Sequence, residues 1–258
     1  MPSVVIAFGF CWRDLKLMLL LATDTSGKNG SVGLARVTPG HREVDVVEVV
    51  PLAGGTFSAQ LVPQIAALLA KHRYTKSDLA AFAVVSGPGS FTGLRVGLAA
   101  IKALAEALQK PIAAVSLLEA VAWSSPTHGR ILAALDAGRH EIYIGDYEQV
   151  DAKRADDKRR ERDSEPALPK HSERLLTRDE FLPEANGKLV VTPDVALAES
   201  LCAAGLQCER IDYPDSGVIA RLGWQHIERG QTVRPDELEA NYIRRSDAEI
   251  FAQPRHQE

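Results

Sequence analysis

The chain has 258 residues, a formal net charge of −4 and ordinary proportions of apolar and charged residues. This length suffices for one large domain or two smaller ones, and the negative net charge excludes a global basic surface for nucleic acid. The three cysteines, Cys11, Cys202 and Cys208, form neither a CxxC motif nor a disulfide framework. Because the seven histidines also lack metal-ligand spacing, we expect a cytoplasmic protein without a resident metal.

Residues 1–17 are difficult to assign. An apolar run at residues 4–7 is too short to span a membrane, and charged residues follow it, whereas a signal peptide places its charge before the apolar segment. Two interpretations remain: an N-terminal extension, or a start codon assigned too early, with Met18 as the natural start. We favour the second, because an apolar strand begins directly after Met18.

The first third of the chain predicts a meander followed by alternating helices and strands. A tight turn at residues 27–30 has hairpin composition. The apolar runs and alternating patterns predict three antiparallel strands and then helix, strand and helix, at residues 18–22, 31–37, 43–50, 58–72, 81–85 and 92–108. This order is that of the ribonuclease-H-like α/β fold, whereas a purely parallel sheet would lack the opening meander.

A glycine-rich loop, SGPGSFTG (residues 86–93), joins the strand at 81–85 to the helix at 92–108. Ser90 and Thr92 are both competent N-caps. A glycine loop that leads into a helix N-terminus suits an anion, but the Gly-Lys-Ser/Thr of a P-loop is absent here. Composition therefore leaves two readings open: a phosphate site, or a turn whose glycines permit tight packing.

The second half of the chain repeats the pattern of a strand, an Asp-bearing turn and a return strand. A strand at 131–135 leads into Asp136, and residues 141–147 alternate as its return strand, much as Asp24 follows the first strand. We therefore expect two related lobes, one at 18–115 and a smaller one at 116–215, with a C-terminal segment, 216–258, packing back on the first. The remaining predicted elements are strands at 112–115 and 189–191, helices at 117–123, 195–204 and 217–229, and an extended piece at 241–245.

The stretch 148–165 mixes seven acidic with six basic residues. A charged run without apolar anchors predicts a solvated loop. Its arginine-rich part, residues 158–162, leaves RNA contact as an alternative.

Four segments carry a family resemblance: LLLATDTS (residues 19–26), SGPGSFTGLRVGL (86–98), LDAGRHEIYIGDY (135–147) and YIRRSDAEIF (242–251). They resemble the TsaB (YeaZ) family, and the resemblance extends over nearly the whole chain from Met18 onward. It implies an actin-like, two-lobed ATPase-type fold and a cytoplasmic role in forming threonylcarbamoyladenosine in tRNA. It further implies that the chain is a non-catalytic scaffold that binds the transferase TsaD. The ATPase TsaE would be the third subunit of the complex, and the chain would reach tRNA only through that complex. A homodimer of the lone chain is an alternative assembly.

Actin-like ATPases hold phosphate at two Asp-bearing turns, so the candidate vestiges here are Asp24 and Ser26 in the first turn and Asp136 and Gly138 in the second. The first turn lacks a glycine beside Asp24, and an Asp without cradling amides would hold Mg²⁺ poorly. We therefore expect no catalytic residue, no metal and no cofactor bound by the lone chain, with ATP or ADP only at the junction with the transferase. A turn-capping role for Asp24 is the alternative, and Ser216-Gly217 is a weak candidate for the adenosine.

The resemblance also implies that the helices at 58–72 and 92–108 form the pairing surface. The predicted contact residues are Phe57, Leu61, Ile65, Leu68, Phe91, Arg95, Gly97, Ala100 and Leu104. Two other functions stay open: a free-standing actin-like ATPase or phosphotransferase, and a peptidase with Ser90 as nucleophile. The peptidase is disfavoured because Gly93 lies one place too late for a G-x-S-x-G motif.

Overall fold

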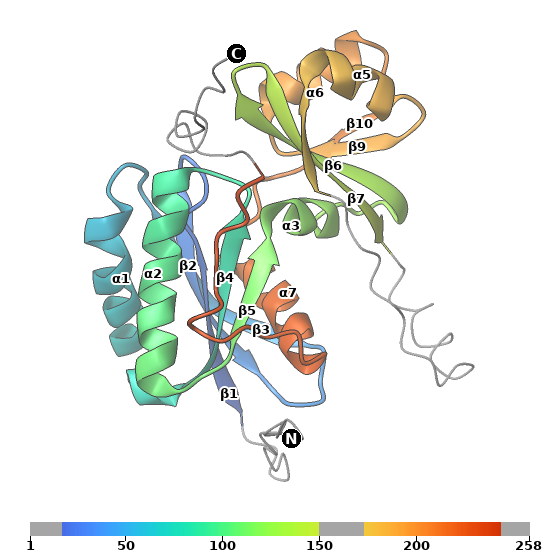
Figure 1. Ribbon diagram of the computed structural model, residues 1–258. Coiled ribbons are helices and arrows are strands. Elements are labelled where there is room, and N and C mark those ends of the chain that lie inside the picture. Colours follow the sequence, from blue (N-terminus) through green and yellow to red (C-terminus); the bar gives the residue numbers. More distant parts are fainter. Residues whose placement is uncertain (1–16, 150–172, 244–258) are drawn as a thin grey trace, which may run out of the picture.

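A computed structural model describes residues 17–149 and 173–243. In it, two α/β lobes lie one above the other, joined along one side (Figure 1). The expectations about residues 1–16, about the charged stretch after Gln149 and about residues 244–245 lie outside the described residues.

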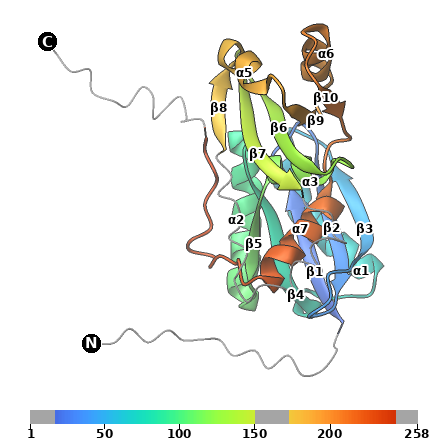
Figure 2. The ribbon, with the colours of Figure 1, turned by 90° about the vertical axis from the view of Figure 1, so that its right-hand side faces the viewer.

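The first lobe is built on a five-stranded sheet in the order β3-β2-β1-β4-β5. Strands β1, β2 and β3 are antiparallel, and β4 and β5 run parallel to β1. Helices α1 and α2 cover one face of this sheet and α7 covers the other (Figures 1 and 2). The bounds are Met18–Asp24 (β1), Gly30–Val37 (β2), Val44–Leu52 (β3), Phe57–Lys71 (α1), Leu79–Gly87 (β4), Phe91–Leu108 (α2), Ile112–Ser116 (β5) and Ser216–Glu228 (α7), with a short 3₁₀ helix at Lys76–Asp78.

The second lobe repeats the same strand order. Its sheet runs β10-β9-β6-β7-β8, so β6 takes the central place of β1, with β7 and β8 antiparallel on one side and β9 and β10 parallel on the other. The bounds are Leu117–Trp123 (α3), Gly129–Gly138 (β6), Glu141–Gln149 (β7), Arg174–Thr177 (β8), Arg178–Ala185 (α5), Leu189–Thr192 (β9), Val195–Ala203 (α6) and Cys208–Arg210 (β10). The predicted α/β class with two related lobes is therefore confirmed.

The last helix of each repeat packs on the sheet of the other repeat. Helix α3 follows β5 of the first sheet but contacts β6, β7 and β9, whereas α7 follows β10 of the second sheet and lies across the first. Trp224 of α7 is fully buried, and its indole N–H donates to the carbonyl oxygen of His41 at 2.8 Å. Buried residues on the inner face of the second sheet, such as Leu135 and Tyr147, belong to the same apolar core as the first lobe. This exchange fixes the lobes against each other.

The apolar pattern explains why the first lobe was predicted more completely than the second. Strand β1 is buried on both faces, so it appears as a continuous apolar run. Helix α2 begins after the N-cap Ser90 and turns a regular apolar stripe to the sheet. In the second lobe, β8, α5 and β10 were not predicted, because the two strands have only four and three residues and α5 carries Pro183 and a largely polar sequence. Within residues 17–149 and 173–243, none of the helices combines the length and the apolar character that a membrane span requires.

Candidate functional site

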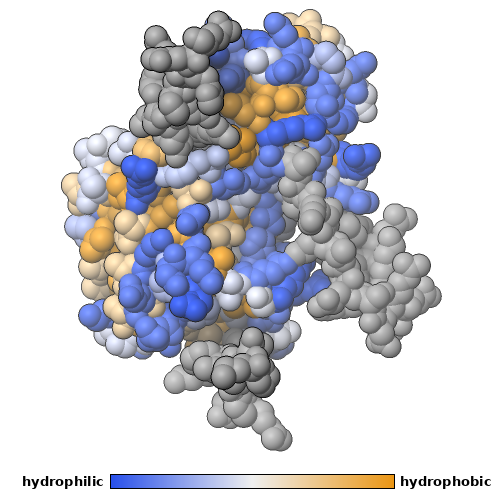
Figure 3. All heavy atoms as spheres, viewed as in Figure 1, coloured by the Kyte–Doolittle hydropathy of each residue, from blue (hydrophilic) through white to orange (hydrophobic). Residues whose placement is uncertain are grey.

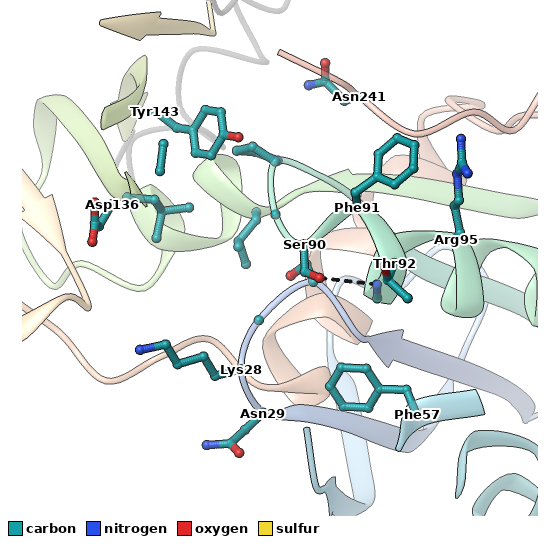
Figure 4. A pocket seen from close by; sticks show the side chains of 18 of the residues that line it. Lys28, Asn29, Phe57, Ser90, Phe91, Thr92, Arg95, Asp136, Tyr143 and Asn241 are labelled. Carbon is teal, nitrogen blue, oxygen red and sulfur yellow. Dashed lines mark hydrogen bonds between the residues drawn. The ribbon is translucent and has the colours of Figure 1, made fainter. Parts of the chain in front are cut away.

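A cleft of about 1500 Å³ lies between the lobes. The β1–β2 turn and the glycine-rich loop before α2 form its first-lobe wall, and the turn after β6 faces them from the second lobe (Figure 4). Lys28, Asp136 and Tyr143 line the cleft, as do Tyr213 and residues 241–243 near the C-terminus. The fold therefore brings both predicted Asp-bearing turns, together with the glycine-rich loop, to one place.

Asp24 is a turn-capping carboxylate in the interior of the first lobe. It is only 1% exposed. Its Oδ1 accepts hydrogen bonds from the backbone N–H of Ser26 at 2.8 Å and from the Ser26 hydroxyl at 2.6 Å. Burial raises the pKa of Asp24 to about 6, and the two bonds from Ser26 oppose this shift. The Ser26 amide, which a phosphate would need, is thus already engaged.

The glycine-rich loop packs closely on that turn. A Cβ at Gly89 would lie 2.6 Å from the carbonyl oxygen of Ser26, and one at Gly93 would overlap the carbonyl oxygen of Thr25. The Ser90 amide donates to the carbonyl oxygen of Ser26 at 2.7 Å, and the Gly93 amide donates to the Ser90 hydroxyl at 3.3 Å. The amides of Ser90 and Gly93 are thus used within the chain, which supports the packing interpretation of the glycines.

The second-lobe turn is more open. Asp136 is exposed, and its Oδ1 accepts from the backbone N–H of Gly138 at 2.9 Å, the same i to i+2 bond that Asp24 makes. Its own amide donates to Asp194 Oδ2 at 2.6 Å. Burial raises the pKa of Asp194, which the bond from Asp136 opposes. Among the described residues, acidic, His and Cys side chains form no group of three or more that could hold a metal ion.

Two further candidates take structural roles. Ser90 is the N-cap of α2, which accounts for its hydroxyl. Ser216 and Gly217, the weak candidates for adenosine, are buried at the start of α7, where the Ser216 amide donates to the Ser31 hydroxyl at 2.9 Å. The suggestion that this pair forms an adenosine loop is therefore corrected: it packs α7 onto β2.

Five of the nine predicted contact residues must be corrected, because they lie inside the lobe. An apolar stripe is the side that a helix turns to its own sheet, so these side chains cannot reach a partner while the lobe stays folded. A Cβ at Gly97 would overlap the Thr25 hydroxyl, so this glycine also serves internal packing. Phe91 and Arg95 are exposed, and Ala100 and Leu104 are partly exposed. The buried five are Phe57, Leu61, Ile65, Leu68 and Gly97.

The surface that α1 and α2 present to solvent is nevertheless apolar. Val62 is 55% exposed, and alanines surround it at helical spacing. Apolar colours gather over these two helices in Figure 3. We call this surface the outer helical face; it consists of Ala59, Val62, Ala66 and Ala70 on α1 and Val96, Ala99, Ala103 and Ala107 on α2.

Sequence reasoning predicted Phe91 and Arg95 as contact residues for another subunit but missed that they hold Tyr242 of the C-terminal segment. The Arg95 guanidinium lies 3.7 Å from the centre of the Phe91 ring, and its Nε donates to the Tyr242 hydroxyl at 3.1 Å. The Phe91 and Tyr242 rings are 4.9 Å apart. The only signal for this cluster was the YIRRSDAEIF motif, whose tyrosine had no predicted partner.

Comparison with known proteins identifies the families and proteins whose sequences this chain resembles. The TsaD family model, described as tRNA N6-adenosine threonylcarbamoyltransferase, matches residues 49–166. An uncharacterized protein of Mycobacterium tuberculosis is 29% identical over 244 residues, which cover 92% of this chain and 97% of that protein. The tRNA threonylcarbamoyladenosine biosynthesis protein TsaB of Bacillus subtilis is 35% identical over 133 residues, 51% of this chain and 56% of that protein. TsaB of Escherichia coli is 30% identical over 135 residues, with the same coverage of 51% and 56%.

Among solved structures, YeaZ from Pseudomonas aeruginosa superposes with a TM-score of 0.62 at 24% identity, covering 87% of this chain and 99% of that one. This likeness shows the fold, which is the actin-like, ribonuclease-H-like one that the sequence predicted. The matched region is about half the length of the two curated TsaB proteins, while the structural likeness spans nearly all of YeaZ. By its four sequence motifs and these curated relatives, this chain is similar to the TsaB (YeaZ) family.

Proposed function

We propose that this chain takes part in forming threonylcarbamoyladenosine in tRNA, as a non-catalytic subunit that binds a TsaD-like transferase through the outer helical face. The names of the TsaB relatives support the pathway. The match of residues 49–166 to the TsaD family supports a partner with a related fold. The observation that carries the proposal is the outer helical face itself.

This face has the properties of a close helix–helix contact. Exposed alanines let a second layer of helices approach closely, and Val62 supplies an apolar projection. The corresponding helix α5 of the second lobe instead exposes Arg178, Asp179 and Glu180, which suit solvent. An exposed apolar patch of this kind marks an interaction site in a soluble protein. A contact of about 800 Å² per partner would be of ordinary size.

The proposed lack of catalysis rests on the cleft. The amides of Ser26, Ser90 and Gly93 are used within the chain, so these three donors are not available to a phosphate. We therefore place any bound ATP or ADP at the junction with the transferase, where the cleft residues Lys28 and Arg139 would offer positive charge. A TsaE-like ATPase would join this complex, tRNA would be reached only through it, and the same face would serve a homodimer in the absence of the transferase.

Co-expression with the paralogous transferase, followed by mass measurement of the purified complex, tests the partner. A Val62→Asp or Ala103→Glu substitution buries a charge at the centre of the contact and should weaken binding at least about 100-fold. Ala203→Glu, which adds the same charge at an exposed alanine of α6, is the matched control and should leave binding unchanged. A complex that survives both substitutions on the outer helical face would contradict the proposal.

Two rivals make different predictions. A free-standing ATPase should bind ATP with Mg²⁺ at micromolar affinity in calorimetry of the lone chain, whereas we expect no such binding. A P. aeruginosa relative at 25% identity is described as similar to the peptidase YEAZ. A peptidase should lose activity on Ser90→Ala. We expect no peptide cleavage by either form, and only the loss of a helix cap, about 1 kcal/mol of stability.

A further inference from the structure

The chain after α7 forms a strap, residues 231–243, that runs back across the first lobe. The strap passes the free edge of β5, where the Val233 amide donates to the carbonyl oxygen of Ile112 at 2.9 Å. Leu238 anchors it in the core at 1% exposure. The strap then reaches the glycine-rich loop, where the Asn241 amide donates to the carbonyl oxygen of Ser86 at 2.7 Å. In Figure 1 this segment leaves the end of α7, crosses the lower part of the first lobe toward α2 and then climbs toward the second lobe.

The end of the strap forms one wall of the cleft. Residues 241–243 line it, and a Cβ at Gly87 would lie 2.8 Å from the carbonyl oxygen of Asn241. The glycine-rich loop is thus shaped to receive the strap as well as the β1–β2 turn. Asn241 and Tyr242 are exposed, so polar contacts add to the contacts of Tyr242 with Phe91 and Arg95 in holding this end of the strap.

The carboxylate of Glu173 accepts hydrogen bonds from three parts of the chain, one of which is the strap. Glu173 lies just before β8. Its Oε1 accepts from the Tyr147 hydroxyl of β7 at 2.6 Å and from the Ser116 hydroxyl at the start of α3. Its Oε2 accepts from the Asn241 side-chain amide at 2.6 Å. Burial raises the pKa of Tyr147, so its hydroxyl stays protonated and donates.

We propose that Glu173 is a positioning residue that latches the strap: it ties Asn241 to β7 of the second lobe and to the start of α3, and so couples the strap to the arrangement of the two lobes. A charge-assisted hydrogen bond is roughly twice as strong as a neutral one. Because one carboxylate makes all three bonds, a change in the cleft that moves β7 against α3 also loosens the strap. This inference does not rest on the proposed function, since it concerns the lone chain.

Hydrogen exchange of the full-length chain, followed by mass spectrometry, tests the latch. The reporter is the backbone N–H of Asn241, which donates to the carbonyl oxygen of Ser86. Only the side chain of Asn241 bonds to Glu173. Glu173→Gln replaces the charged acceptor with a neutral amide, which can offer the Asn241 side chain only a weaker bond, and should speed exchange of the Asn241 backbone N–H about tenfold. Asn241→Asp sets two carboxylates together and should speed exchange at residue 241 by at least as much. Tyr147→Phe, which removes only the bond from the second lobe, should have a smaller effect in the same direction.

The double variant Glu173→Gln with Asn241→Asp reverses the polarity of the bond, because the glutamine amide then donates to the aspartate. Exchange should return to within about threefold of the parent. Glu209→Gln is the matched control: Glu209 also accepts two hydroxyl bonds, from Ser125 and Thr127, but does not touch the strap. It should leave exchange of the strap unchanged.

Three results would overturn the latch: unchanged exchange in both single variants, fast exchange that the double variant fails to restore, or an equal effect of Glu209→Gln. Thermal unfolding of each variant identifies any global loss of fold. Because Asn241 is exposed, Asn241→Asp should leave overall stability unchanged. This variant therefore tests the latch even if Glu173→Gln lowers overall stability.

Discussion

The two lobes share one strand order but differ at the turn that each presents to the cleft. In both, an Asp at the end of the central strand accepts a backbone N–H two residues on, Asp24 from Ser26 and Asp136 from Gly138. Asp24 is buried beneath the glycine-rich loop, whereas Asp136 is exposed. The same topology therefore supports a closed turn in one lobe and an open one in the other.

The helices that cover the two sheets also differ in the residues that they expose to solvent. Helices α1 and α2 of the closed lobe present alanine and valine to solvent, while α5 of the open lobe presents charged residues. The first lobe thus packs the glycine-rich loop closely against its Asp-bearing turn and leaves an apolar surface on its outside. This contrast indicates that repeated topology positions equivalent turns but does not give them equivalent chemistry; the residues packed against each turn decide that.

The largest effect is expected where the closed turn is tightest. Gly93→Ala would place a methyl group onto the carbonyl oxygen of Thr25, which is main chain and cannot move aside cheaply. We expect a loss of about 3 kcal/mol or more in the free energy of unfolding, measured by urea denaturation. Thr92→Ala, one residue earlier on an exposed side of α2, should change it by less than about 0.5 kcal/mol. Equal effects would show that the loop is not packed as described.

A smaller effect is expected from the buried carboxyl of the closed turn. Burial raises the pKa of Asp24 to about 6 from an ordinary value of 3.8, so the folded state holds its proton more tightly than the unfolded state. Stability from this group is therefore full below about pH 4, falls as pH rises to about 6, and stays low above that.

Asp24→Asn keeps an oxygen acceptor for the Ser26 amide and removes the ionisation. We expect the variant to lack this fall between pH 4 and 6 and, at pH 7, to be more stable than the parent by on the order of 1–3 kcal/mol. Urea denaturation of both proteins across this range gives the difference. A parent protein that gains stability relative to the variant over the same range would contradict the assignment.

The smallest effect is expected at the open turn. Asp136→Asn retains an oxygen for the Gly138 amide in a solvent-exposed place, so the free energy of unfolding should change by less than about 0.5 kcal/mol. The same denaturation series measures it. A change as large as that of Asp24→Asn would remove the distinction between the two turns.

The sequence predicted most of the first lobe because its signals are local. A buried strand such as β1 is continuously apolar, and α2 has both a cap and a 3.6-residue stripe. The repeated Asp-bearing turn was enough to predict a second lobe. Short polar elements such as β8 and β10 give no such signal, since their stability comes from pairing with strands already in place.

By its own pattern, the sequence determined the class of fold, the order of the meander and the presence of two turns with Asp. Only the tertiary structure decided which glycines pack against which turn, that Asp24 is buried, which side of α1 and α2 faces solvent, and that Glu173 meets Asn241. Each of these depends on contacts between residues far apart in the chain, and periodicity, which is read within one element, carries no information about what packs against that element.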